Sequence, residues 1–150
     1  MSINLKRMTL EDVAAVYEIE RNLFPDPWPE QSFTRDVLDT KIAHPFVAFD
    51  NNEIVGYFVC WYYSGEVHIG NVAVKKSRQQ EGIGKLLMKE IFRIFPKYQF
   101  AYLEVRYDNL PAIRLYDHFG FKEMYRRRAY YPNGDDAVVM VKIREEIMRG

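Results

Sequence analysis

The sequence predicts an α/β fold in which a mixed β-sheet carries helices on both faces. Three strand-like segments follow one another between residues 45 and 74, which is typical of an antiparallel meander. A glycine-containing loop and an amphipathic helix then lead to a further strand, so that strands alternate with helices in the second half. The length of 150 residues fits one domain with a sizeable core, and we expect residues 1–150 to form a single domain.

The first elements are a short strand and a helix with one apolar face. Thr9 is a suitable N-cap, and Asp12 stands three residues later, where a capping box has its partner. Val13, Val16 and Leu23 keep one face of the helix apolar. Three prolines in PDPWPEQSF then separate it from a second helix. We predict a strand over 3–8, a helix over 9–24 and a second helix that ends between 36 and 40.

The later elements are bounded by turn residues. DNNE and Ser64-Gly65 separate the meander strands, Pro96 ends a helix, and Gly120 occupies a C-cap position. The predicted strands are 45–49, 54–63, 66–74, 101–107, 121–131 and 137–143, and the predicted helices are 83–95 and 111–119. The expected order is therefore βααβββαβαββ.

Composition excludes several classes of function. The formal net charge is zero, which disfavours a nucleic-acid or anionic-membrane partner. Cys60 is the only cysteine, and no Cys/His cluster has the spacing of metal ligands. The start of the chain is charged and has no apolar signal core. We expect a cytoplasmic, monomeric protein without a metal ion.

Gly82 and Gly84 stand where the helix 83–95 begins. One interpretation is a tight turn between strand and helix. The other is an anion site, because the first amides of a helix lack intrahelical partners and its dipole attracts negative charge. Glycines also let a ligand approach the backbone. Four cations surround the loop, against the single acid Glu81: they are Lys75, Lys76, Arg78 and Lys85.

The loop matches neither the Walker pattern nor the dinucleotide fingerprint. Gln79-x-x-Gly82-x-Gly84, directly after NVAV, instead resembles the acyl-CoA pyrophosphate loop of the GNAT N-acetyltransferases. LEVRYDNLPAIRLYDHFGF, RRRAYYPNGDDAVVM and LFPDPWPEQSF resemble segments of the RimI type, the ribosomal-protein alanine N-acetyltransferases. This resemblance covers essentially the whole chain. The departures are Lys75-Lys76, where an acid and a proline are common, and Glu81 beside the expected pyrophosphate.

The resemblance implies the GNAT fold and acetyl-CoA as cosubstrate, with no metal. It assigns cofactor binding to Val72, Ala73, Val74, Gln79, Gln80, Glu81, Gly82, Ile83, Gly84, Lys85, Asn109 and Tyr116. Asn109 alone is equally explained as a residue that starts a helix.

Two residues are candidates for proton transfer. In AYLEVRY, Glu104 shares a polar strand face with Tyr102 and Arg106, although a sheet covered on both sides should be apolar. The pattern alone leaves a solvated edge or an ion pair with Arg106 equally open. The resemblance makes Glu104 the general base. Tyr116 shares an apolar stripe, which indicates a core position, but the resemblance makes it the general acid.

The resemblance also implies that the acceptor is a protein N-terminus, in particular the N-terminal alanine of a small-subunit ribosomal protein. Its candidate binding residues are Tyr130, Tyr131 and Trp28, with Phe24 a weaker one. The three histidines are expected to have structural or surface roles. Two alternatives stay open: a GNAT enzyme that acetylates a small-molecule amine, and a CoA-binding regulatory module without catalysis.

Overall fold

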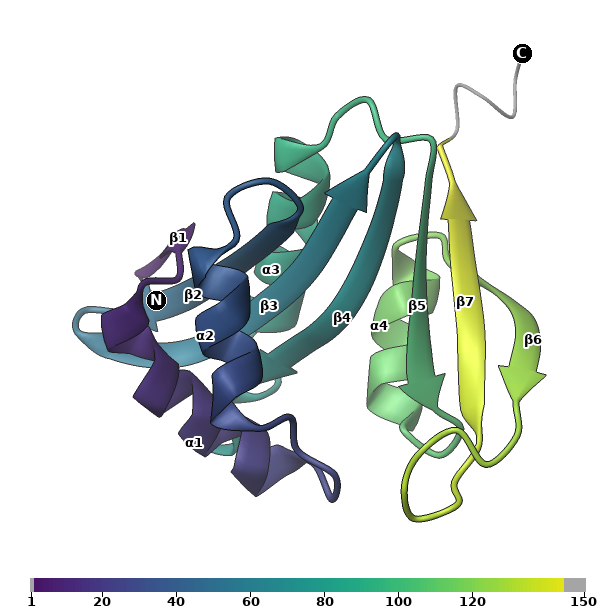
Figure 1. Ribbon diagram of the computed structural model, residues 1–150, viewed down its shortest axis with the longest axis horizontal. Coiled ribbons are helices and arrows are strands. Elements are labelled where there is room, and N and C mark those ends of the chain that lie inside the picture. Colours follow the sequence, from purple (N-terminus) through teal and green to yellow (C-terminus); the bar gives the residue numbers. More distant parts are fainter. Residues whose placement is uncertain (1, 145–150) are drawn as a thin grey trace.

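The computed structural model describes residues 2–144 and confirms the predicted order of elements (Figure 1). The strands are β1 (Ile3–Arg7), β2 (Ala43–Asp50), β3 (Glu53–Tyr63), β4 (Glu66–Val74), β5 (Phe100–Arg106), β6 (Lys122–Arg127) and β7 (Ala137–Ile143). The α-helices are α1 (Val13–Leu23), α2 (Glu30–Leu38), α3 (Ile83–Ile94) and α4 (Leu110–His118). Short 3-10 turns precede α1 (Leu10–Asp12) and α3 (Lys76–Arg78).

The strands form one mixed sheet in the order β1-β2-β3-β4-β5-β7-β6. β4 and β5 are the parallel neighbours, and every other neighbouring pair is antiparallel. The parallel pairing joins Glu66–Ile69 to Phe100–Leu103 and stops there. Beyond Ile69, β4 continues along β3, while none of the strands in residues 2–144 pairs with its other edge. Figure 1 shows β4 and β5 diverging there.

Helices cover both faces of the sheet, as predicted, because the strands alternate their apolar side chains. Along β3, Phe58 and Cys60 enter a core that also contains Leu87 and Ile91 of α3. The intervening Tyr57 and Val59 enter a second core with residues of α1 and α2. A sheet buried on both faces explains why β3 reads as a continuous apolar run.

The predicted boundaries needed few corrections. β6 runs from Lys122 to Arg127, so the strand predicted over 121–131 continues four residues too far at its C-terminal end. Ala129 has a positive φ of 50°, and its N–H donates to Asp136 at 2.9 Å, which starts a turn where a strand was expected. Asp12 accepts the N–H of Thr9 at 2.8 Å, as the capping prediction required. Within residues 2–144, no helix has the length and apolarity needed to cross a membrane.

Candidate active site

The divergence of β4 from β5 begins at a glycine. Val59 pairs with Asn71 and Cys60 with Ile69, so Gly70 is an extra residue in β4, which makes a bulge. A Cβ at Gly70 would lie 2.6 Å from the rings of both Trp28 and Trp61. The loop between α1 and α2 can therefore pack Trp28 against β4 only because this position has no side chain.

A groove of about 370 Å³ follows the free edge of β4 to the start of α3. The residues that line it are Leu23, Phe24, Val72, Ala73, Val74, Gln79, Gln80, Gly82, Ile83, Gly84, Asn109, Pro111, Ala112, Leu115 and Tyr116. The structure thus brings ten of the twelve predicted cofactor residues together. Lys85 lines an adjoining hollow with Gln80, Gly82, Gly84 and Arg114, and Glu81 lines neither.

The mouth of α3 is open to a ligand. Gly82 is the N-cap, with φ of 87° in the left-handed region, and no side chain caps the helix. A Cβ built at Gly82 meets nothing within 4 Å. The first amides of α3 therefore face space that a phosphate can occupy.

The predicted cation cluster around this loop is largely absent, which corrects the sequence analysis. Arg78 is held by three acids: Asp50 at 2.9 Å, Glu81 at 3.0 Å and Glu53 at 3.4 Å. These contacts explain the carboxylate of Glu81, because its charge is matched by an arginine. They also raise the pKa of Arg78, most of all through its hydrogen bond to Glu81.

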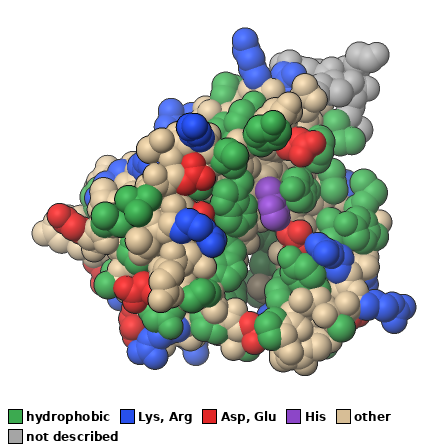
Figure 2. Space-filling view, viewed as in Figure 1, with side chains coloured by type: hydrophobic (Ala, Val, Ile, Leu, Met, Phe, Trp, Pro, Cys, Tyr) green, Lys and Arg blue, Asp and Glu red, His purple; other side chains and the backbone are tan. Residues whose placement is uncertain are grey.

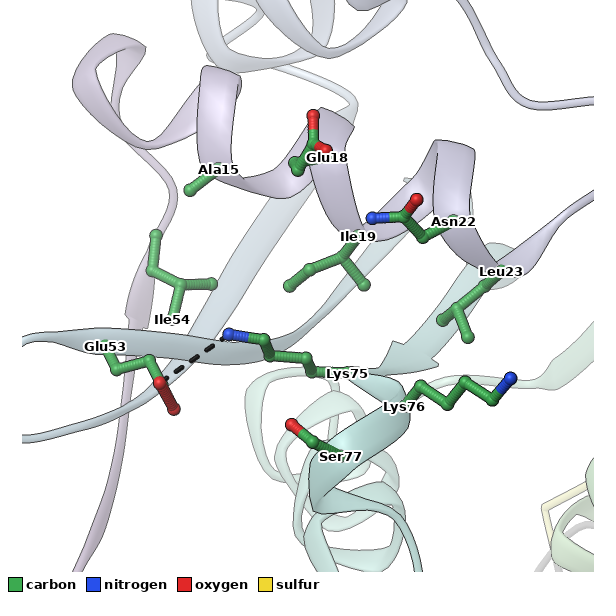
Figure 3. Close-up of a pocket in the computed structure, with 10 residues that line it drawn as sticks. All are labelled: Ala15, Glu18, Ile19, Asn22, Leu23, Glu53, Ile54, Lys75, Lys76 and Ser77. Carbon is green, nitrogen blue, oxygen red and sulfur yellow. Dashed lines mark ion pairs between the residues drawn. The ribbon is translucent and has the colours of Figure 1, made fainter.

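Lys75 and Lys76 line a different hollow, of about 580 Å³ (Figure 3). It lies between α1, the start of β3 and the residues that follow β4. Lys75 pairs there with Glu53 at 3.6 Å, and Lys76 lies at the same rim. Of the four predicted cations, only Lys85 lines a hollow at the mouth of α3, where Arg114 of α4 joins it. Sequence reasoning missed Arg114, because the α3–α4 contact is not visible in spacing along one helix.

Glu104 lies beside the divergence, one residue past the last β5 residue that pairs with β4. Its Oε2 is 2.8 Å from Nε2 of His68, and its Oε1 is 3.8 Å from Arg127. The ring of His68 stacks on Tyr102 at 4.4 Å between centroids. The ion pair with Arg106 that the pattern left open is not formed, and His68, predicted to have a structural or surface role, contacts the proposed base.

Tyr116 occupies the junction between the groove and a narrower cavity that also holds Glu104. Its side chain is buried and belongs to the core, as the apolar stripe indicated, while the residue also lines both hollows. Burial raises the pKa of the Tyr116 hydroxyl, so the group keeps its proton even above the pH at which an ordinary tyrosine ionises. Within the described residues, no hydrogen-bond partner holds this hydroxyl.

The narrower cavity has a volume of about 90 Å³. It is lined by Glu20, Phe24, Asp26, Trp28, Gly70, Asn71, Val72, Glu104, Val105, Arg106, Asn109, Ala112, Tyr116 and Tyr131. Figure 2 shows the molecular face above it hollowed between hydrophobic side chains, with an imidazole at the edge. Among the predicted acceptor residues, Trp28 and Tyr131 line this cavity, and Tyr130 packs against Tyr131 at 5.1 Å.

Arg106 ties together the two loops that border the cavity. It donates to Asp26 of the α1–α2 loop at 2.5 Å and to Asp135 of the β6–β7 loop at 2.7 Å. Its guanidinium also lies 4.0 Å from the ring centroid of Tyr131, a cation–π distance. Burial raises the pKa of Tyr131 to about 12, although the arginine opposes the shift. The sequence did not indicate this cluster, because its members are far apart in the chain.

Asn109 acts as the N-cap of α4, since its side chain accepts the N–H of Ala112 at 3.3 Å. It also lines both the groove and the narrow cavity. The helix-start interpretation is therefore confirmed, while a contact with the cofactor stays a prediction.

Comparison with known proteins identifies the family. The model of the Acetyltransferase (GNAT) family matches residues 13–121. The chain belongs to the GNAT acetyltransferase family. Its crossover helix α3 and the divergence of β4 from β5 both fall inside the matched region.

The relatives of this GNAT acetyltransferase include enzymes of the RimI type. It is 31% identical to the ribosomal protein bS18-alanine N-acetyltransferase of Escherichia coli strain K12, over 86% of this chain and 89% of the relative. An N-alpha-acetyltransferase of Sulfurisphaera tokodaii is 32% identical, with 91% of this chain and 90% of the relative covered. The crystal structure of the Escherichia coli ribosomal-protein-S18-alanine N-acetyltransferase superposes with a TM-score of 0.86 at 28% identity, covering 95% and 94% of the two chains.

Acetyl-CoA use is typical of GNAT enzymes, and the residues present fit that group. The free edge of β4 offers backbone groups to the amides of a pantetheine arm, in the manner of an added strand. The uncapped mouth of α3 offers amides to a diphosphate. Leu115 and Ala112 supply an apolar wall between them.

Proposed function

We propose that this GNAT enzyme transfers the acetyl group of acetyl-CoA to the α-amine at the N-terminus of a protein. The observation that carries the proposal is the narrow cavity at the end of the β4–β5 pairing, where Glu104, Tyr116 and the free edge of β4 meet. Bound acetyl-CoA supplies a thioester that an amine can attack directly. The chain must then take a proton from the amine, stabilise the carbonyl oxygen and protonate the departing thiolate.

Glu104 is the proposed general base. Its Oε2 lies 2.8 Å from Nε2 of His68, so the imidazole N–H donates to the ionised carboxylate and holds it in place beside the cavity. The ring is itself fixed between Tyr102 and Trp61, whose centroids lie 4.4 and 5.2 Å away. We assign His68 as a positioning residue for Glu104.

Tyr116 is the proposed general acid. A tyrosine hydroxyl is protonated at neutral pH, and burial raises the pKa of this one further. The residue also stands where the groove enters the cavity. A thiolate that leaves at this junction can take the proton from it. No covalent bond to the enzyme is needed, and Cys60 is fully buried in the core.

Two observations favour a protein N-terminus over a polyamine as acceptor. The cavity of about 90 Å³ suits a small first side chain such as alanine. Arg106 engages both Asp26, which lines the cavity, and Asp135, so these two charges are matched and less able to bind a polycation. Relatives named for alanine and α-amine acetylation support the same choice, and we propose the N-terminal alanine of a small-subunit ribosomal protein as the acceptor.

The test is a competition assay with radiolabelled acetyl-CoA. The acceptors are a peptide with a free N-terminal alanine, the same peptide blocked at its N-terminus but containing lysine, and spermidine. We expect the free alanine peptide to take nearly all the label. A preference for spermidine would establish a small-molecule enzyme instead, and CoA binding without transfer to any amine would indicate a regulatory module.

A further inference from the structure

Besides Glu104 and Asp26, a third carboxylate lines the cavity, and it has no role in the proposed chemistry. Glu20 lies on α1, and only 1% of it is exposed. The other buried residues of this helix are apolar. Burial raises its pKa, against the opposing effect of its hydrogen bonds. A buried acid is costly unless its oxygens are satisfied, so its partners decide what it does.

Three elements donate to this one carboxylate. Oε2 accepts the backbone N–H of Trp28 in the α1–α2 loop at 2.8 Å. Oε1 accepts the side-chain amide of Asn71 on β4 at 2.8 Å and a short hydrogen bond from the hydroxyl of Tyr57 on β3. Glu20 therefore joins the loop that borders the acceptor side to the strands that form the floor.

The joined positions flank the place where the reaction is proposed to occur. Asn71 follows the bulge at Gly70 and belongs to the part of β4 that has left β5. The ring of Trp28 packs against Gly70 itself, where any Cβ would collide with it. A shift of either Trp28 or Asn71 would change the width of the cavity opposite Glu104.

We propose that Glu20 is a positioning residue that fixes the acceptor wall of the active site relative to Glu104. The inference rests on the proposed function, because it assigns Glu20 to acceptor binding. A carboxylate suits the role since both of its oxygens accept and neither donates. In Glu20→Gln, one of the two carboxylate oxygens is replaced by an NH₂ group, which donates. That NH₂ must then face another donor: either the N–H of Trp28, or the donors Asn71 and Tyr57.

The experiment measures acceptor KM, kcat and the CoA dissociation constant for wild type, Glu20→Gln, Tyr57→Phe and Asp36→Asn. Misplacement by about 1 Å can cost about 100-fold. We expect Glu20→Gln to raise the KM of the alanine peptide at least about tenfold on that scale. CoA affinity should not change, because Glu20 does not line the cofactor groove.

Tyr57→Phe keeps the inference testable if Glu20→Gln does not fold. Tyr57 is fully buried and lines neither the cavity nor the groove, so an effect on acceptor KM must pass through the partners of its hydroxyl, Glu20 and Asn71. Removing one donor of three should raise this KM by about two- to tenfold, the range of one hydrogen bond.

Asp36→Asn is the matched control. Asp36 is the other buried acid of the described chain, accepts from Trp61 at 3.4 Å, and does not line the cavity. It should change the melting temperature without changing acceptor KM.

Unchanged acceptor KM in Tyr57→Phe and in a folded Glu20→Gln would overturn the inference. Equal losses of acceptor and CoA binding would also overturn it, since Glu20 would then only stabilise the fold. A wild-type protein that binds CoA but acetylates no peptide would instead overturn the proposed function, and the inference with it.

Discussion

The proposed cofactor side and the proposed acceptor side of the divergence between β4 and β5 are built on different principles. The cofactor side is formed mainly by backbone: the free edge of β4, the uncapped start of α3 and two glycines. Its nearby charges, such as Arg78, are engaged elsewhere. The acceptor side is a network of side chains, in which Glu20, Glu104 and Arg106 each bind partners from other elements.

This difference indicates which groups determine the recognition of the cofactor and which determine the recognition of the acceptor. Backbone amides recognise a diphosphate and a pantetheine arm whatever the side chains are, so the cofactor side tolerates changes that keep the backbone path. A side-chain network has defined donors and acceptors, so single substitutions should retune the acceptor. Substitutions on the two sides should therefore separate CoA binding from acceptor use.

The largest effect is expected at Glu104. Glu104→Gln should slow the chemical step by about 10²–10⁴-fold and leave CoA affinity unchanged. In wild type the rate should rise with pH as the acceptor α-amine deprotonates, near pH ~8. Part of the loss should return at high pH, where the amine arrives neutral. The readout is a single-turnover pH profile, with the exposed Glu123→Gln as control; a constant loss at every pH would contradict a base.

Tyr116→Phe should lower turnover by a comparable factor, about 10²–10⁴-fold, if thiolate protonation limits the rate. Because burial raises the pKa of Tyr116, the hydroxyl stays protonated above pH ~10, and wild-type activity should not fall between pH 9 and 10 through its ionisation. Tyr98→Phe, a buried tyrosine outside both hollows, is the control. If Tyr116→Phe keeps full turnover while the chemical step limits the rate, Tyr116 serves only as a core residue and not as the acid.

Gly82→Val should weaken CoA binding about 100-fold, because a side chain would enter the open mouth of α3 and its φ of 87° disfavours one. Isothermal calorimetry with CoA measures the change. Gly134 is a matched control, with φ of 90° and equally open space, on the β6–β7 loop. Gly134→Val carries similar backbone strain and should bind CoA normally; equal losses in both variants would mean that strain alone is responsible.

Arg106→Gln should raise the acceptor KM about tenfold, because it releases Asp26 and Asp135 from each other. CoA affinity should stay within about twofold, since Arg106 lies outside the cofactor groove. Steady-state kinetics with the alanine peptide give the comparison. Arg93→Gln is the control, because Arg93 is exposed and its ion-pair partner among the described residues is Glu90. A selective gain of activity on spermidine would show that the freed acids create a polyamine site.

The smallest effects are expected at two arginines near the glycine loop. Arg114 lines the hollow at the mouth of α3, whereas Arg78 is already paired with acids. Arg114→Gln should weaken CoA about two- to fivefold, in keeping with an exposed charge, and more at low salt. Arg78→Gln should leave CoA affinity unchanged, because its guanidinium already binds three acids. The reverse result, with Arg78 affecting affinity and Arg114 not, would restore the cation cluster expected from the sequence.

The sequence by itself determined the order of elements, the open start of α3 and the polar face of β5. Each depends on local rules: period-two alternation around Glu104, a glycine at the N-cap of α3, and turn residues between strands. The end of β6 was misplaced, because a turn held by Asp136 from across the hairpin interrupts a stretch that looks extended.

The tertiary structure alone decided which charges remain available and what holds each functional side chain. Arg78 is close to the glycine loop in sequence, yet its guanidinium forms an ion pair with Asp50, 28 residues away. His68 meets Glu104 across 36 residues and Asn71 meets Glu20 across 51. Periodicity reports which face of an element a residue occupies, but such partners are set by strand order and register. Ion pairing and desolvation act between neighbours in space, so they emerge only when the sheet is assembled.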